Sequence, residues 1–140
     1  MLAMATFCIP KHRRHVPLAR QRVHTTLAAW GFTGEVADHA ALSANELVTN
    51  AVSHCRVSSA QVRVTLILCG PQLVLEVSDP DRDRLPLPRD PGPDEEGGRG
   101  LAMVAALADA WGHRQGPYTK TVWARFTLIP AEATRVPDCS

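Results

Sequence analysis

The sequence has little net charge and no long apolar run, and both shortages exclude whole classes of protein. Its 140 residues carry a net charge of +1 at pH 7, which argues against a general affinity for nucleic acid or for membrane surfaces. No apolar run approaches the roughly 20 residues that a transmembrane helix needs. The apolar N-terminus has its charges after it, at residues 11–15, so it does not form a signal peptide. We therefore expect a cytoplasmic protein without a membrane span.

Cysteine motifs for metal or redox chemistry are also missing. The four cysteines, Cys8, Cys55, Cys69 and Cys139, lie far apart and form no CxxC pair. Neither a zinc site nor a redox motif is indicated by that spacing. We expect reduced, partly buried thiols.

What is present is the pattern of one α+β domain. We expect a single domain over residues 1–130 and a flexible tail over 131–140. Helical spacing and strand alternation predict helices over 16–30, 33–54 and 101–111, the last ended by Gly112, and strands over 7–10, 61–68, 73–77 and 119–129, with a further short strand at 112–115. This order predicts a two-layer sandwich in which a mixed, mostly antiparallel sheet carries helices on one face.

Residues 79–98 interrupt that pattern. They contain five prolines and seven acids, which leave little to bury. A loop of that length inside a compact domain is usually functional or disordered. We expect high mobility over residues 82–97.

Two short segments carry polar residues that suit a binding site. Glu46, Asn50 and His54 stand at i, i+4 and i+8 of a predicted helix, so they share one face. The amide oxygen of Asn is a suitable ligand for Mg²⁺. Asp79 ends an apolar strand and can accept a hydrogen bond from an amino group. On spacing alone, a solvated helix face explains the first three residues better than a binding site does, and a turn before Pro80 explains Asp79 equally well.

A third segment contains glycines at the start of a predicted helix. In Gly97-Gly98-Arg99-Gly100-Leu101, the glycines let the backbone approach a phosphate, and a helix N-terminus offers unpaired N–H groups to an anion. A flexible hinge explains the same glycines. Lys120-Thr121 on the final strand adds a hydroxyl that can reach the same pocket.

The order of these segments resembles the GHKL family of ATP-binding domains, which have the Bergerat fold. Glu46-x-x-x-Asn50-Ala51 looks like the N box of that family, Asp79 like the start of its G1 box, and residues 98–101 like its G2 box. Lys120-Thr121-Val122-Trp123 looks like its closing threonine motif. The resemblance covers about residues 7–128 and is most specific to anti-sigma-factor serine/threonine kinases.

The resemblance implies a role for each matching residue. Asn50 would hold Mg²⁺ between the phosphates of ATP, and Asp79 would read the adenine amino group with help from the Thr121 hydroxyl. Glu46 would be the general base for a substrate serine or threonine. The residues expected to contact ATP are Asn50, Ser53, Asp79, Gly98, Arg99, Gly100, Leu101 and Thr121, with Gly98 and Gly100 cradling phosphate in a lid.

The chain departs from the family pattern in the lid. The G1 box of the wider family is Asp-x-Gly-x-Gly, whereas this chain reads Asp79-Pro80-Asp81-Arg82-Asp83. Both glycines are missing, and the acids at 94–96 would repel a triphosphate unless they turn outward. These departures argue against catalytic turnover of ATP more than they argue against ATP binding.

The start of the chain is basic. Residues 1–34 contain no acid, and Lys11, Arg13, Arg14, Arg20 and Arg22 are clustered there. The cluster fits either a solvated helix face or a surface for an acidic partner, such as a sigma factor or a second subunit. Direct nucleic-acid binding is the least favoured reading, because no aromatic residues suited to stacking on bases accompany the cluster.

Two main hypotheses of function follow from the resemblance. The first is a serine/threonine kinase that binds a sigma factor, phosphorylates an antagonist protein and forms a homodimer, as such kinases often do. The second is a non-catalytic ATP-binding interaction module, favoured by the altered G1 box. A third, the catalytic domain of a sensor histidine kinase, is disfavoured because such domains usually carry Lys three residues after the N-box Asn, where this chain has Ser53.

Overall fold

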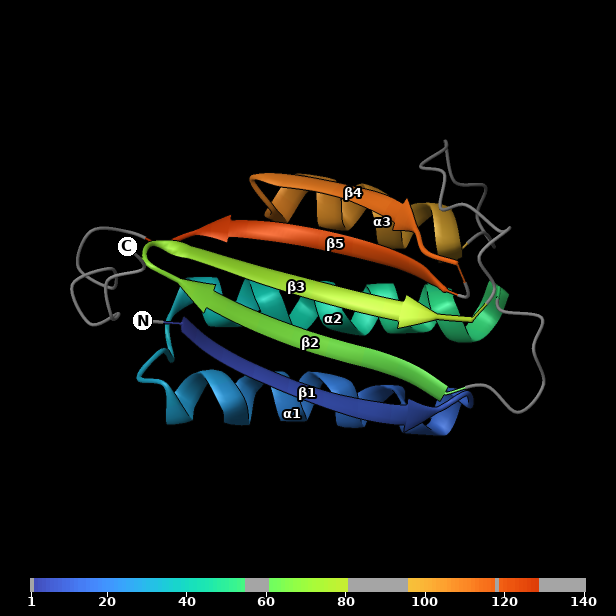
Figure 1. The fold of residues 1–140 in the computed structure, drawn as a ribbon, viewed down its shortest axis with the longest axis horizontal. Helices are drawn as coiled ribbons and strands as arrows, with labels where there is room; N and C mark the ends of the chain where they lie inside the picture. The colour runs from blue at the N-terminus through green and yellow to red at the C-terminus, as the bar shows by residue number, and fades with distance from the viewer. Residues whose placement is uncertain (1, 55–60, 81–95, 118, 129–140) are drawn as a thin grey trace.

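The structure is a computed structural model that describes residues 2–54, 61–80, 96–117 and 119–128, with the backbone alone described at 54 and 96–100. In these ranges a five-stranded sheet is covered on one face by helices (Figure 1). The predicted tail, 131–140, and most of the segment expected to be mobile, 82–97, lie outside the described residues. The elements are β1 (Leu2–Pro10), a 3-10 turn η1 (Arg13–His15), α1 (Val16–Ala29), α2 (Glu35–His54), β2 (Gln61–Cys69), β3 (Gln72–Asp79), α3 (Glu96–Leu107), β4 (Ala110–Gln115) and β5 (Lys120–Thr127).

The sheet has the strand order β1-β2-β3-β5-β4, and every neighbouring pair is antiparallel. The predicted two-layer α+β fold is therefore confirmed, with a sheet that is antiparallel throughout the described strands. β5 lies between β3 and β4, so the final strand of the chain enters the interior of the sheet. This insertion places the start of β5 directly beside the end of β3, where Asp79 pairs with Lys120.

Alternation along the strands decides which side chains meet the helices. On β2 the four residues Val62, Val64, Leu66 and Leu68 are buried, while the residues between them are exposed or half-buried. Because successive side chains of a strand point to opposite faces, one face packs on the helices and the other stays open. The alternation predicted for β2 and for β5 is confirmed.

α2 lies in the middle of the helical layer and contacts α1, α3 and the central strands. Its sheet-facing side is rich in small residues, with Ala37, Ala40, Ala41 and Ala44 almost fully buried. Small side chains let the helix axis approach its neighbours closely, while Leu47 and Val48 supply larger buried surface. Each such large side chain contributes about 1.5–3 kcal/mol on burial.

The last helix and the strand after it differ from the prediction. α3 spans Glu96–Leu107, so it begins earlier and ends earlier than the predicted 101–111. Trp111 and Gly112 belong to β4 instead. Gly112 does not stop a helix: a Cβ there would lie 2.8 Å from Cζ2 of Trp123 on the neighbouring strand. Pairing with β5 therefore overrides the helical pattern of residues 108–111.

β1 and one cysteine also differ from the expectations. β1 begins at Leu2 rather than at residue 7, because its whole length pairs with β2. Cys69 is disulfide-bonded, whereas Cys8 is free and exposed. The expectation of reduced thiols is therefore wrong at Cys69, since sequence spacing does not reveal which distant cysteines a fold brings together. No helix within the described ranges is both long enough and apolar enough to cross a membrane.

Candidate functional site

The segments singled out in the sequence meet at one end of the molecule. Four element ends lie together at one end of the sheet, which is the edge of the molecule that carries the site (Figure 1). They are the C-terminal end of α2, the end of β3, the start of β5 and the N-terminal end of α3. α2 contacts α3, β3 and β5 directly. These contacts bring polar residues that are distant in the sequence to the same end of the molecule.

Asp79 forms a buried ion pair at this edge. It is the last residue of β3 and lies opposite Lys120, the first residue of β5. Asp79 is 3% exposed and Lys120 is 4% exposed, and the carboxylate Oδ2 lies 3.5 Å from the ammonium Nζ. Alternation places both side chains on the helix-facing side, in line with the buried Val77 and Val122. Burying two charges is costly unless they are paired, so the carboxylate is held in place by a partner.

Glu46 and Asn50 lie one turn apart near the C-terminal end of α2, and both are half-buried. Half-burial leaves a carboxylate and an amide able to meet a ligand while the helix restricts their positions. Ser53, one turn beyond Asn50, is exposed, and the His54 side chain lies outside the described part. No cluster of three or more His, Cys, Asp or Glu side chains suited to a metal is found among the described residues. A Mg²⁺ ion here would thus depend on Asn50 and on oxygens of a bound phosphate.

The glycine segment forms the first turns of α3 rather than a loop before it. Gly98, Arg99 and Gly100 lie inside α3, which begins at Glu96. The side chain of Leu101 is 2% exposed and belongs to the hydrophobic core. Leu101 can therefore meet a phosphate only through its backbone. The N-terminal turn of a helix still offers unpaired N–H groups and the positive end of the helix dipole.

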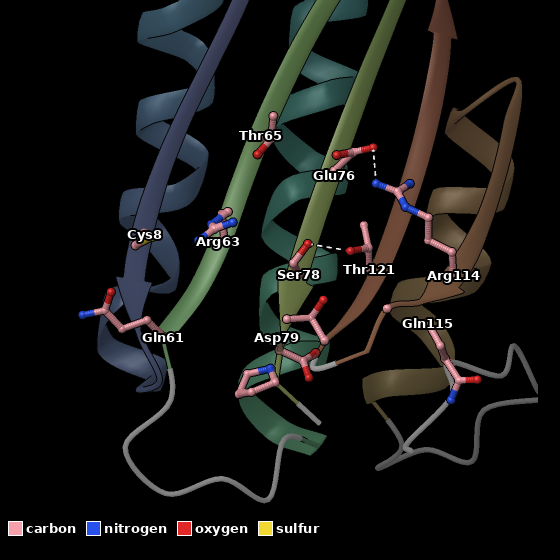
Figure 2. A pocket seen from close by; sticks show the side chains of 13 residues that line it. Cys8, Gln61, Arg63, Thr65, Glu76, Ser78, Asp79, Arg114, Gln115 and Thr121 are labelled. Atoms are coloured by element: carbon pink, nitrogen blue, oxygen red, sulfur yellow. Dashed lines mark hydrogen bonds and ion pairs between the residues drawn. The ribbon is translucent and has the colours of Figure 1, made fainter. Parts of the chain in front are cut away.

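The Thr121 hydroxyl pairs with Ser78, while Thr121 and Asp79 both line one pocket. The Thr121 side chain lies on the open face of the sheet, where its Oγ1 is 2.7 Å from Oγ of Ser78 (Figure 2). The structure puts Lys120 beside Asp79 instead, and sequence reasoning missed Lys120. The signal was available in the sequence, because strand alternation puts Lys120, not Thr121, on the same face as the apolar Val122 and Ala124.

A broad pocket of about 580 Å³ occupies this end of the open face. Figure 2 shows Arg63, Ser78, Thr121 and Arg114 around it. Arg114 Nη2 donates to Glu76 Oε2 at 2.8 Å, and Asp79 reaches the rim. The sheet lies between this pocket and the helices (Figure 2), so the pocket is on the other side from the half-buried residues of α2. Asp79 is the residue of the predicted site that lines it together with Thr121.

Known proteins share both the sequence pattern and the fold of this chain. The model of the histidine kinase-like ATPase domain matches residues 9–126, which is most of the chain. The chain belongs to this family. No curated protein sequence matches it. Among solved structures, it is similar to the histidine kinase domain of the blue-light activated histidine kinase EL346 from Erythrobacter litoralis.

The structural match supports the fold. It has a TM-score of 0.51 and 19% sequence identity, and it covers 94% of this chain and 67% of the other. At that identity the match speaks for the fold alone. Together with the family match, it makes this chain an ATPase domain of the GHKL, histidine kinase-like type. ATPase domains of this family bind ATP, usually with Mg²⁺.

Proposed function

We propose that the chain binds Mg-ATP at the edge where α2, β3, β5 and α3 meet, and that it acts as an anti-sigma-type serine/threonine kinase. It would bind a sigma factor and phosphorylate an antagonist protein on serine or threonine. The observation that carries the proposal is the convergence at one edge of the half-buried Glu46 and Asn50, the buried Asp79 and the N-terminal turn of α3.

Asp79 suits the base of the nucleotide. Its carboxylate is buried at the end of a strand, where competition from water is weak. A carboxylate can only accept hydrogen bonds, and the exocyclic amino group of adenine can only donate. Hydrogen bonds to a charged group contribute about 1.5–3 kcal/mol, so Asp79 is the residue on which base recognition depends most.

Asn50, the α3 N-terminus and Glu46 suit the phosphates and the reaction. The amide oxygen of Asn50 would be a Mg²⁺ ligand, and the backbone N–H of Gly98, in the first turn of α3, would donate to a phosphate oxygen. Gly100 lies in the second turn, so it would serve by leaving room for the phosphate rather than by donating its N–H. The Glu46 carboxylate would take the proton of the substrate hydroxyl while that oxygen bonds to the γ-phosphorus and the bond to ADP breaks. Transfer of this kind rests mainly on positioning and charge neutralisation.

The basic start of the chain suits an acidic protein partner. Arg13 and Arg14 are exposed in η1, and Arg20 and Arg22 are exposed on α1. η1 and α1, which carry these side chains, lie on the side of the molecule away from α3 (Figure 1). Charge of one sign over a contiguous surface speeds association with a partner of opposite charge. A sigma factor or a second copy of the chain is the partner we propose.

A non-catalytic ATP-binding module is the second candidate. The absence of both glycines from Asp79-Pro80-Asp81-Arg82-Asp83 favours it, since the glycines allow close backbone approach in a working lid. The presence of Glu46 favours the kinase, because a protein that only binds ATP has less need of a general base.

Calorimetry with Mg-ATP is the first test. The wild type should bind, and Asp79→Ala and Asn50→Ala should each lose binding. Phosphotransfer from γ-labelled ATP to a panel of small candidate antagonist proteins then separates the two hypotheses, with Glu46→Ala as control. Acid-stable label that Glu46→Ala abolishes supports the kinase, acid-labile label indicates phosphohistidine, and ATP binding without any label supports the module. A folded wild type that binds no ATP contradicts both.

A further inference from the structure

Lys120 is one of only two lysines in the chain, the other being Lys11, and its position is unusual for a lysine. Lysine is almost never fully buried unless it is paired, yet Lys120 is 4% exposed. Its ammonium lies 3.5 Å from the Asp79 carboxylate at the end of the sheet that carries the proposed nucleotide site.

A purely structural role explains this pair poorly. Replacing a buried ion pair by apolar residues of similar volume is often neutral or stabilising, and the rest of the helix-facing side of β3 and β5 is apolar, including Val77 and Val122. The chain nevertheless has a donor and an acceptor side by side at the edge of a binding site. Such a pair is suited to a ligand that presents an acceptor beside a donor.

We propose that Lys120 is a base-reading residue, which together with Asp79 recognises the polar edge of a purine and admits guanine as well as adenine. This inference rests on the proposed binding of a nucleotide at Asp79. The carboxylate accepts an N–H of the base, and the Lys120 ammonium donates to the adjacent acceptor. Lys120 thereby becomes the residue that sets the preference between the two purines.

The two purines present different partners to this pair. Adenine offers its 6-amino group to Asp79 and a neighbouring ring nitrogen to Lys120. Guanine offers its N1–H and 2-amino group to Asp79 and its carbonyl O6 to Lys120. Without the ammonium, each purine loses one hydrogen bond and keeps its contact with Asp79. Guanine is then left with its carbonyl O6, a stronger acceptor than the ring nitrogen of adenine, unpaired beside the Asp79 carboxylate. Removal of Lys120 should therefore harm guanine binding more than adenine binding.

Other polar groups at this end of the sheet are placed differently. Arg114 lies on the open face and donates to Glu76, and Thr121 lies on that face against Ser78. Arg114 therefore offers a matched control, as a cation at the same end of the sheet but on its other side.

The test is competition against a ribose-labelled fluorescent ATP by unlabelled ATP and GTP, with Mg²⁺. The wild type should bind GTP within about tenfold of ATP. Lys120→Met should weaken both nucleotides and should weaken GTP about tenfold more than ATP, because only guanine is left with an unpaired carbonyl oxygen beside the carboxylate. Arg114→Met should leave the GTP to ATP ratio unchanged.

A second series uses the wild type alone, so that the test survives if Lys120→Met does not fold. Inosine triphosphate, which lacks the 2-amino group, should bind less tightly than GTP, and purine riboside triphosphate, which lacks the 6-amino group, less tightly than ATP. The inference is overturned if ATP binds but GTP competes more than about 100-fold more weakly, or if Lys120→Met leaves the ratio of the two unchanged. If no triphosphate binds the folded wild type, the proposed function itself fails.

Discussion

Two consecutive residues at the end of β3 lie in opposite environments. Asp79 faces the helices, where it is paired with the buried Lys120. Ser78 faces the open side, where it shares a 2.7 Å hydrogen bond with Thr121 beside a broad pocket. Charges interact strongly where water is excluded and weakly where it is present. The helical layer therefore holds the Asp79 carboxylate beside a buried cation, whereas the open face carries the Ser78–Thr121 hydrogen bond and the partly exposed Arg114–Glu76 ion pair.

The largest effect is expected from Asp79→Ala. It should abolish ATP binding and also destabilise the fold by about 3–5 kcal/mol, because it leaves the Lys120 ammonium buried without this partner. Calorimetry and urea unfolding measure the two effects. Ser78→Ala is the neighbouring control and should cost about 1 kcal/mol or less. Equal losses for the two variants would contradict the contrast between the faces.

The same contrast should hold for identical apolar side chains on β3. Val77 is 2% exposed on the helix side, and Val74 is half-buried on the open side. We expect Val77→Ala to cost about 2 kcal/mol, from lost transfer energy and the cavity left behind. Val74→Ala should cost less than about 1 kcal/mol. Denaturant midpoints of the two variants check this, and a reversed order would show that the open face is covered in solution.

Gly112→Ala probes close packing on the open face. The added Cβ would lie 2.8 Å from the Trp123 ring, and over-packing of this kind costs about 1–3 kcal/mol. At Gly116 a Cβ would lie 3.3 Å from Thr119 Oγ1 at its nearest, so Gly116→Ala should cost less. Thermal unfolding measures both. A further Trp123→Leu change should recover part of the stability that Gly112→Ala loses. If it does not, the contact with the Trp123 ring is not the cause of that loss.

The smallest effect is expected from Thr121→Val. Its hydroxyl bonds Ser78 on the open face, so its loss should cost about 1 kcal/mol of stability and leave ATP affinity within about twofold, since the group lies across the sheet from Asp79. Calorimetry with Mg-ATP decides the matter. A loss as large as that of Asn50→Ala would restore Thr121 to the role that the family resemblance implies.

The sequence by itself determined most of the architecture and the elements that carry the site. Helical spacing and strand alternation located α1, α2, β2, β3 and β5 to within a few residues, because those periods follow directly from burial on one face. The same sequence placed Glu46 and Asn50 on one helix and Asp79 at a strand end. What it could not supply was the length of β1, which depends on its pairing with β2, or the boundary between α3 and β4, which depends on Trp123 packing over Gly112.

The composition of the site was decided only by the tertiary structure. The sequence draws attention to Thr121, since residues 120–123 look like the closing threonine motif of the family, whereas Lys120 resembles an ordinary surface lysine. The insertion of β5 between β3 and β4 puts Lys120 opposite Asp79, and the helices above bury both. Alternation along the segment already puts Lys120 on the face of Val122, but which carboxylate it meets there depends on strand register and on the layer that covers it, and neither is encoded in the short segment itself.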